Sequence, residues 1–88
     1  MTRKERDAEV SRLASASGLS TGQGIGNNTW LISRGGDHLG ILAYNQRHGG
    51  WKAVGSKLSR AHFGGLAELL AVFAAVPPPG KPLIEVLD

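Results

Sequence analysis

The chain has 88 residues, which leaves room for one domain with one small hydrophobic core. It contains no cysteine, which excludes disulfides and cysteine-based zinc sites and fits a reducing compartment. The net charge of +3 is modest, but residues 29–63 carry five Lys and Arg against one Asp, a local charge of +4. A basic segment of this kind attracts polyanions such as nucleic acids.

The first predicted element is a helix from about Arg3 to Ala16. Thr2 and Glu5 have the spacing of a capping box, in which each side chain bonds the backbone amide of the other residue. Gly18 is expected to follow the helix as its C′ residue. The charged N-terminal residues are not followed by an apolar run, so we expect no signal peptide.

Residues 18–28 are rich in glycine and contain the run Gly22-Gln23-Gly24-Ile25-Gly26. The run suggests a phosphate-binding loop, but it lacks the Gly-Lys-Ser/Thr ending and precedes a predicted strand instead of a helix. We therefore expect a flexible connector here. An anion site formed by backbone amides is the less favoured alternative.

Three β-strands are predicted next, at Trp30–Arg34, Leu39–Asn45 and Trp51–Val54. Glycine-containing turns separate them, which indicates antiparallel hairpins. Alternation along the strands predicts one core face and one polar face. A bulge at Gly40, where another group would approach closely, would exchange the two faces. The predicted core face comprises Trp30, Ile32, Leu39, Ile41, Trp51 and Ala53.

A very apolar helix is predicted at Gly65–Val76. The segment from Gly55 to Phe63 before it fits either an extension of the third strand or a capped turn, and we expect Phe63 to fix the helix entry onto the core. Because the helix is apolar nearly all round, it should be covered on more than one side. A homodimer is one way to cover it. The residues predicted to form the dimer interface are Leu66, Leu69, Leu70, Val72, Phe73 and Val76.

The last predicted element is a short strand at Leu83–Leu87, after prolines that end the helix. The fold class is therefore α+β, with an N-terminal helix, a three-stranded antiparallel sheet, a packing helix and a C-terminal strand. One domain is expected. Its parts are 1–28 (helix and Gly-rich connector), 29–76 (sheet-plus-helix core) and 77–88 (Pro-rich linker and strand). No apolar run is long enough to span a bilayer, so we expect a cytoplasmic protein without a membrane partner.

The sequence offers no catalytic or metal-binding motif. His38, His48 and His62 are 10 and 14 positions apart, without the i, i+4 spacing of a helical zinc site. No Gly-x-Ser-x-Gly elbow occurs, and the acidic residues that follow residue 28 fall in separate predicted elements. We therefore expect no enzymatic activity, no metal and no cofactor.

Binding of nucleic acid, with DNA favoured over RNA, is the leading functional prediction. Cations would hold phosphates, planar side chains would probe bases, and a small sheet can enter the major groove. The predicted phosphate contacts are Arg34, Arg47, Lys52, Lys57 and Arg60, and the predicted base contacts are Tyr44, Gln46 and His48. The alternative function is a protein–protein module, an assembly adaptor or an inhibitor of a larger enzyme, that acts through the apolar helix and the last strand. These polar groups could also be only the solvated face of an antiparallel sheet.

Two families share the predicted order of elements. Three strands followed by a packing helix resemble the AP2-like and integrase arm-binding domains, which implies DNA binding through the sheet face. With the N-terminal helix included, the order is also similar to double-stranded-RNA-binding domains, although the lysine expected after Lys57 is missing. The first resemblance is favoured, and a small regulator of phage or plasmid type would fit it. Its matching segments are Trp30, Leu39-Gly40-Ile41, Trp51-Lys52-Ala53 and Leu66–Phe73.

Overall fold

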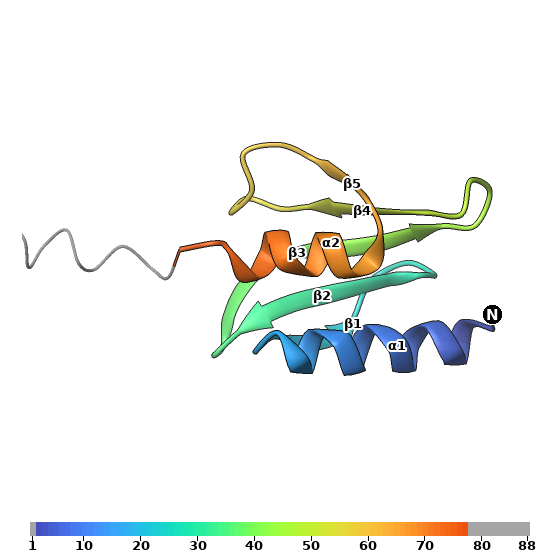
Figure 1. The fold of residues 1–88 in the computed structure, drawn as a ribbon, viewed down its shortest axis with the longest axis horizontal. Coiled ribbons are helices and arrows are strands. Elements are labelled where there is room, and N and C mark those ends of the chain that lie inside the picture. The colour runs from blue at the N-terminus through green and yellow to red at the C-terminus, as the bar shows by residue number, and fades with distance from the viewer. Residues whose placement is uncertain (1, 78–88) are drawn as a thin grey trace, which may run out of the picture.

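The strands of this protein form one antiparallel sheet in the order β1-β2-β3-β4-β5, so each strand pairs with its neighbour in sequence. The computed structural model describes residues 2–77 (Figure 1). The α+β class is confirmed, and the predicted strand Leu83–Leu87 lies outside the described residues. The elements are α1 (Arg3–Ala16), β1 (Ser20–Gln23), β2 (Thr29–Arg34), β3 (Asp37–Asn45), β4 (Gly50–Val54), β5 (His62–Gly64) and α2 (Leu66–Ala74).

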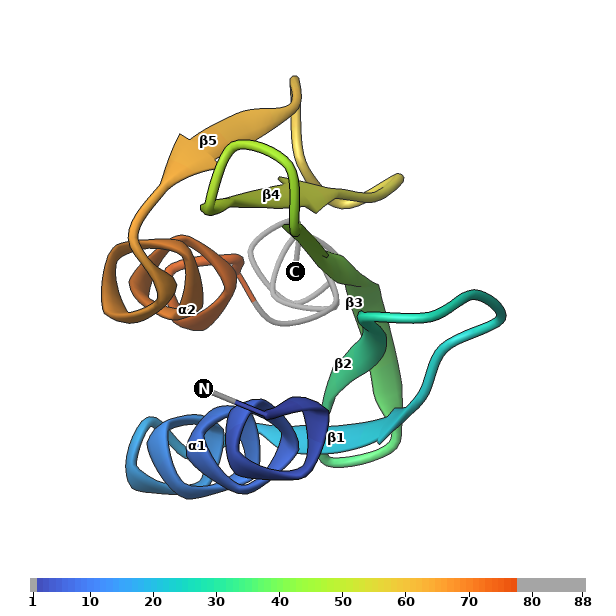
Figure 2. The same ribbon diagram turned by 90° about the vertical axis from the view of Figure 1, so that its right-hand side faces the viewer.

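Both helices lie on the same side of the sheet. Figure 2 shows the sheet curling around them, with α1 beside β1 and α2 facing β4 and β5. The two helices also contact each other, so they close the concave side of the sheet. In the described part of the chain, no helix covers the convex face. The buried hydrophobic core comprises Val10, Ala14, Leu19, Trp30, Ile32, Leu39, Leu42, Ala53, Leu69, Leu70, Phe73 and Val76.

The predicted capping box at the start of α1 is confirmed. The Thr2 amide donates to Glu5 Oε1 at 2.7 Å, and the Glu5 amide donates to Thr2 Oγ1 at 3.1 Å. The hydrogen bond from the Thr2 backbone lowers the pKa of Glu5, and the hydrogen bond with the Thr2 side chain lowers this pKa further. The stabilisation by this carboxylate is therefore present at neutral pH and is lost as the pH falls through the lowered pKa. Gly18 follows the helix with a φ of +76°, as expected for a C′ glycine.

The sheet has two strands that the sequence did not predict. β1 lies within the expected flexible connector 18–28, and that prediction is wrong because Ser20–Gln23 pair with Trp30–Ser33. β5 pairs His62–Gly64 with Trp51–Ala53. β1 contains few residues of high β propensity, and β5 is too short to show an alternation. Their pairing with neighbouring strands, not their own sequence, therefore makes them strands.

A register shift in the β2–β3 hairpin decides which side chains of β3 enter the core. Ile32 pairs with Gly40 and Ser33 with His38, so Leu39 stands between two paired positions. The bulge predicted at Gly40 therefore lies at the neighbouring Leu39, while Gly40 itself is paired. Because of this shift, Leu39 and Leu42 are both fully buried, whereas Ile41 is only half-buried on the convex face. The predicted core position of Ile41 is wrong for this reason.

The large side chains of α2 are already covered within the chain. Leu69, Leu70 and Phe73 are at most 1% exposed, and Val76 is 7% exposed. These four residues were predicted to form a dimer interface, but they belong to the core of the described chain. The exposed positions of α2 are alanines, together with Gly65 at its N-cap and Glu68 in its first turn. Leu66 and Val72, the other two predicted interface residues, are half-buried, and a homodimer stays a prediction.

Gly40 lies where the sheet and α2 approach most closely. A Cβ at this position would meet the Val54 carbonyl oxygen and would lie 2.8 Å from Phe73 Cε1. The predicted close approach at Gly40 is therefore confirmed. The absence of a side chain lets the fully buried ring of Phe73 pack directly on the backbone of β3.

We predict that Gly40→Ala lowers the free energy of unfolding by roughly 1–3 kcal/mol, because the added methyl overpacks this contact. Urea denaturation followed by circular dichroism measures the change. Gly26→Ala is the matched control, since nothing lies within 4 Å of a Cβ there. Equal stability of the two variants would contradict the close packing of α2 on β3.

Candidate nucleic-acid interface

Arg34, a predicted phosphate contact, instead binds the C-terminal end of α2. Its guanidinium donates to the carbonyl oxygens of Ala74 at 3.2 Å and Val76 at 2.7 Å. The last carbonyls of a helix have no partners within the helix and carry the negative end of its dipole. Arg34 therefore fastens α2 to the end of β2, and we leave it out of the candidate interface.

We predict that Arg34→Ala destabilises the protein by about 1–2 kcal/mol, because the carbonyl oxygens of Ala74 and Val76 lose a charged donor. Chemical denaturation measures the effect. Arg60→Ala is the control, since Arg60 is exposed in the loop between β4 and β5 and its loss changes the net charge equally. If both variants lost the same stability, the cause would be charge alone and the anchoring role would be refuted.

Lys57 and Arg60 lie in the loop between β4 and β5. Figure 1 shows this loop at the end of the sheet opposite the β3–β4 turn. The Lys57 ammonium is 3.8 Å from a carboxylate oxygen of Asp37, so part of its charge is balanced locally. The structure therefore does not bring all five predicted phosphate contacts onto one surface.

Tyr44, a predicted base contact, belongs to an aromatic cluster on the helix side of the sheet. Its ring centroid is 4.8 Å from that of Trp51, and Trp51 lies 5.5 Å from Trp30. The guanidinium of Arg6 lies over the Tyr44 ring at 4.4 Å and also donates to Asn28 Oδ1 at 3.0 Å. Tyr44 is half-buried and packs against the core, and it also lines the groove around the β3–β4 turn.

Gln46, Arg47 and His48 form the turn between β3 and β4, and all three are exposed. The side-chain oxygen of Asn45 accepts hydrogen bonds from the backbone amides of Arg47 at 2.9 Å and His48 at 3.3 Å. Gly49 closes the turn with a φ of +69°, a conformation that favours glycine. The backbone of the turn is thus fixed while its side chains project into solvent.

Lys52 and Phe63 lie side by side on the convex face, because they are directly paired between β4 and β5. The Lys52 ammonium is 5.9 Å from the centroid of the Phe63 ring. Phe63 is 70% exposed, so the prediction that it fixes the helix entry onto the core is wrong. Burying such a ring would contribute about 1.5–3 kcal/mol of stability, which residues 2–77 do not gain here. A prediction of β5 as a strand would have placed Phe63 opposite Lys52. The three residues of β5 are too few to show the alternation that indicates a strand.

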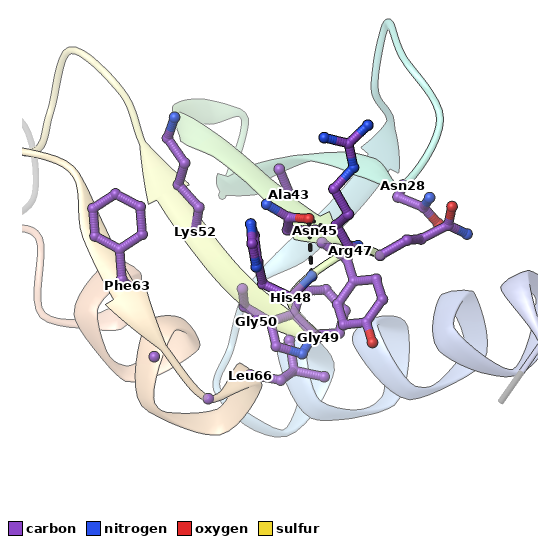
Figure 3. A pocket seen from close by; sticks show the side chains of 15 residues that line it. Asn28, Ala43, Asn45, Arg47, His48, Gly49, Gly50, Lys52, Phe63 and Leu66 are labelled. Carbon is purple, nitrogen blue, oxygen red and sulfur yellow. Dashed lines mark hydrogen bonds between the residues drawn. The ribbon is translucent and has the colours of Figure 1, made fainter.

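The exposed residues of this region surround an open groove around the β3–β4 turn (Figure 3). No Asp or Glu is among the described residues that line the groove. Neither Arg47 nor Lys52 forms an ion pair within the described range. We call the following set the hairpin surface: Gln46, Arg47, His48, Lys52 and Phe63.

Comparisons with known proteins identify no relative. No family model matches the chain, and neither a curated protein nor a solved structure is similar to it. Within residues 2–77, no group of three His, Asp or Glu side chains gathers in a way that could hold a metal ion. The helices described here are also too short or too polar to cross a membrane.

Proposed function

We propose that the protein binds nucleic acid through the hairpin surface without catalysing a reaction. The observation that carries this proposal is the groove around the β3–β4 turn, which offers the cations Arg47 and Lys52 and, among the described residues, no lining carboxylate. A cleft lined by charges of one sign concentrates the field and attracts a polyanion. The electrostatic contacts to phosphates would supply most of the affinity.

The remaining predicted cations support the choice of this surface over the others. Arg34 binds the end of α2 and Lys57 faces Asp37. Arg12 on α1 is paired with Glu9 at 2.8 Å. Arg47, Lys52 and Arg60 form no ion pair within residues 2–77. Of these three cations, only Arg47 and Lys52 line one groove, where a phosphate backbone could contact both.

A binding role fits the chemistry of the hairpin surface better than catalysis. The surface contains one imidazole, His48, and no carboxylate that could orient it or share a proton with it. In Ser-His-Asp arrangements a carboxylate orients the imidazole, and no residue of the hairpin surface could do so for His48. Gln46 and His48 instead offer donors and acceptors for base edges. The order of the helices and strands favours a regulatory role on DNA.

We predict that the protein binds a labelled DNA oligonucleotide with an affinity that falls steeply between about 50 and 200 mM salt. Arg47→Ala and Lys52→Ala should each weaken binding and reduce the salt slope by roughly 1, because each removes one phosphate contact. Fluorescence anisotropy at several salt concentrations measures both quantities, with the oligonucleotide offered as a single strand and as a duplex.

Lys57→Ala is the matched control for these two variants. It removes the same charge from the opposite end of the sheet, where Lys57 already faces Asp37. Its affinity and salt slope should stay close to those of the unmodified protein. If it weakened binding as much as Lys52→Ala, or if neither form of DNA bound at low salt, the proposed function would be wrong.

A further inference from the structure

We infer that the nucleic acid bound at the hairpin surface is single-stranded, with a base stacked on Phe63 and a phosphate held by Lys52. This inference rests on the proposed function and adds the form of the nucleic acid to it. It follows from three features: an exposed aromatic ring on a paired strand, an apolar floor beside it on the convex face, and a groove whose lining residues within 2–77 include no Asp or Glu.

The backbone that carries the Phe63 ring is held by strand pairing. Its neighbours His62 and Gly64 pair with Ala53 and Trp51, so the ring projects from an ordered strand and not from a loop. It is 70% exposed, and the Lys52 ammonium lies beside it. Aromatic side chains on strands, next to cations that track the backbone, are the way in which sheets bind unpaired bases.

The part of the convex face nearest Phe63 and Lys52 is mainly apolar, whereas the hydroxyls of Ser20 and Ser33 lie farther away, on β1 and β2. The strand registers place Ala43 beside Lys52, and the neighbouring row carries Leu31, Ile41 and Val54. Thr29 continues the row of Ala43, but its hydroxyl donates to the Gly26 carbonyl at 2.7 Å. A duplex exposes base edges and phosphates, and reading them requires side-chain donors and acceptors. A single strand exposes the faces of its bases, which this apolar floor fits.

The turn between β3 and β4 extends this surface along a strand of nucleic acid. Arg47 and His48 line the same groove as Lys52 and Phe63 (Figure 3). Arg47 and Lys52 can each contact a phosphate, while Gln46 and His48 can bond the edges of bases next to the stacked one. Stacking accepts every base because each has a π-face, so we expect a weak preference for sequence.

The experiment compares the affinity of the full chain for a fluorescent oligothymidine with that for the same strand annealed to its complement. We expect tighter binding of the single strand. Phe63→Leu should weaken single-strand binding by about 5- to 150-fold, the range that one stacked base contributes. Phe63→Tyr should restore most of the affinity, because it keeps the ring. Thermal unfolding checks that both variants fold, as expected for an exposed position.

Each outcome either supports the inference or overturns it. If the duplex bound as tightly as the single strand, or if Phe63→Leu bound like the unmodified protein, the inference would fall while the proposed function would stand. If neither form bound at low salt, both would fall. The apolar convex face would then be left for a protein partner.

Discussion

The register shift between Ile32 and Ser33 is the constraint on which the rest of the structure depends. It turns both Leu39 and Leu42 toward the helices, where they are fully buried. Ile41 is left on the convex face. Without the shift, the alternation of β3 would bury one of these leucines and expose the other. Gly40, next to the shift and two residues before Leu42, faces Val54 and Phe73, so the bulge and the docking of α2 lie side by side in β3.

The position of α2 explains why one face of the sheet stays free. Phe73 packs on Gly40, and Arg34 holds the last carbonyls of the helix. α1 covers β1 and contacts α2, so the large apolar residues of both helices are buried on the concave side. Phe63 and Lys52 remain on the convex side, where nothing in the described chain packs over them. A protein of this size has few side chains to cover a second face of its sheet.

The sequence predicted those helices and strands whose own residues carry a strong pattern. The capping box and the apolar spacing located both helices, and aromatic and β-branched runs located β2, β3 and β4. β1 and β5 were missed because their pairing is a tertiary effect. Of the predicted site residues, Tyr44, the turn residues and Lys52 line one groove. Arg34, Tyr44 and Lys57 have partners distant in sequence, namely α2, Arg6 and Asp37, which no local pattern indicates.

The central claim is that the convex face and the β3–β4 turn, and not the helices, contact nucleic acid. An NMR titration of the isotope-labelled protein with oligothymidine tests it most directly. The account predicts shifts of the backbone amides of Arg47, His48, Lys52 and Phe63, with little change along α1 and α2. Shifts confined to the helices, or spread evenly over the chain, would contradict it.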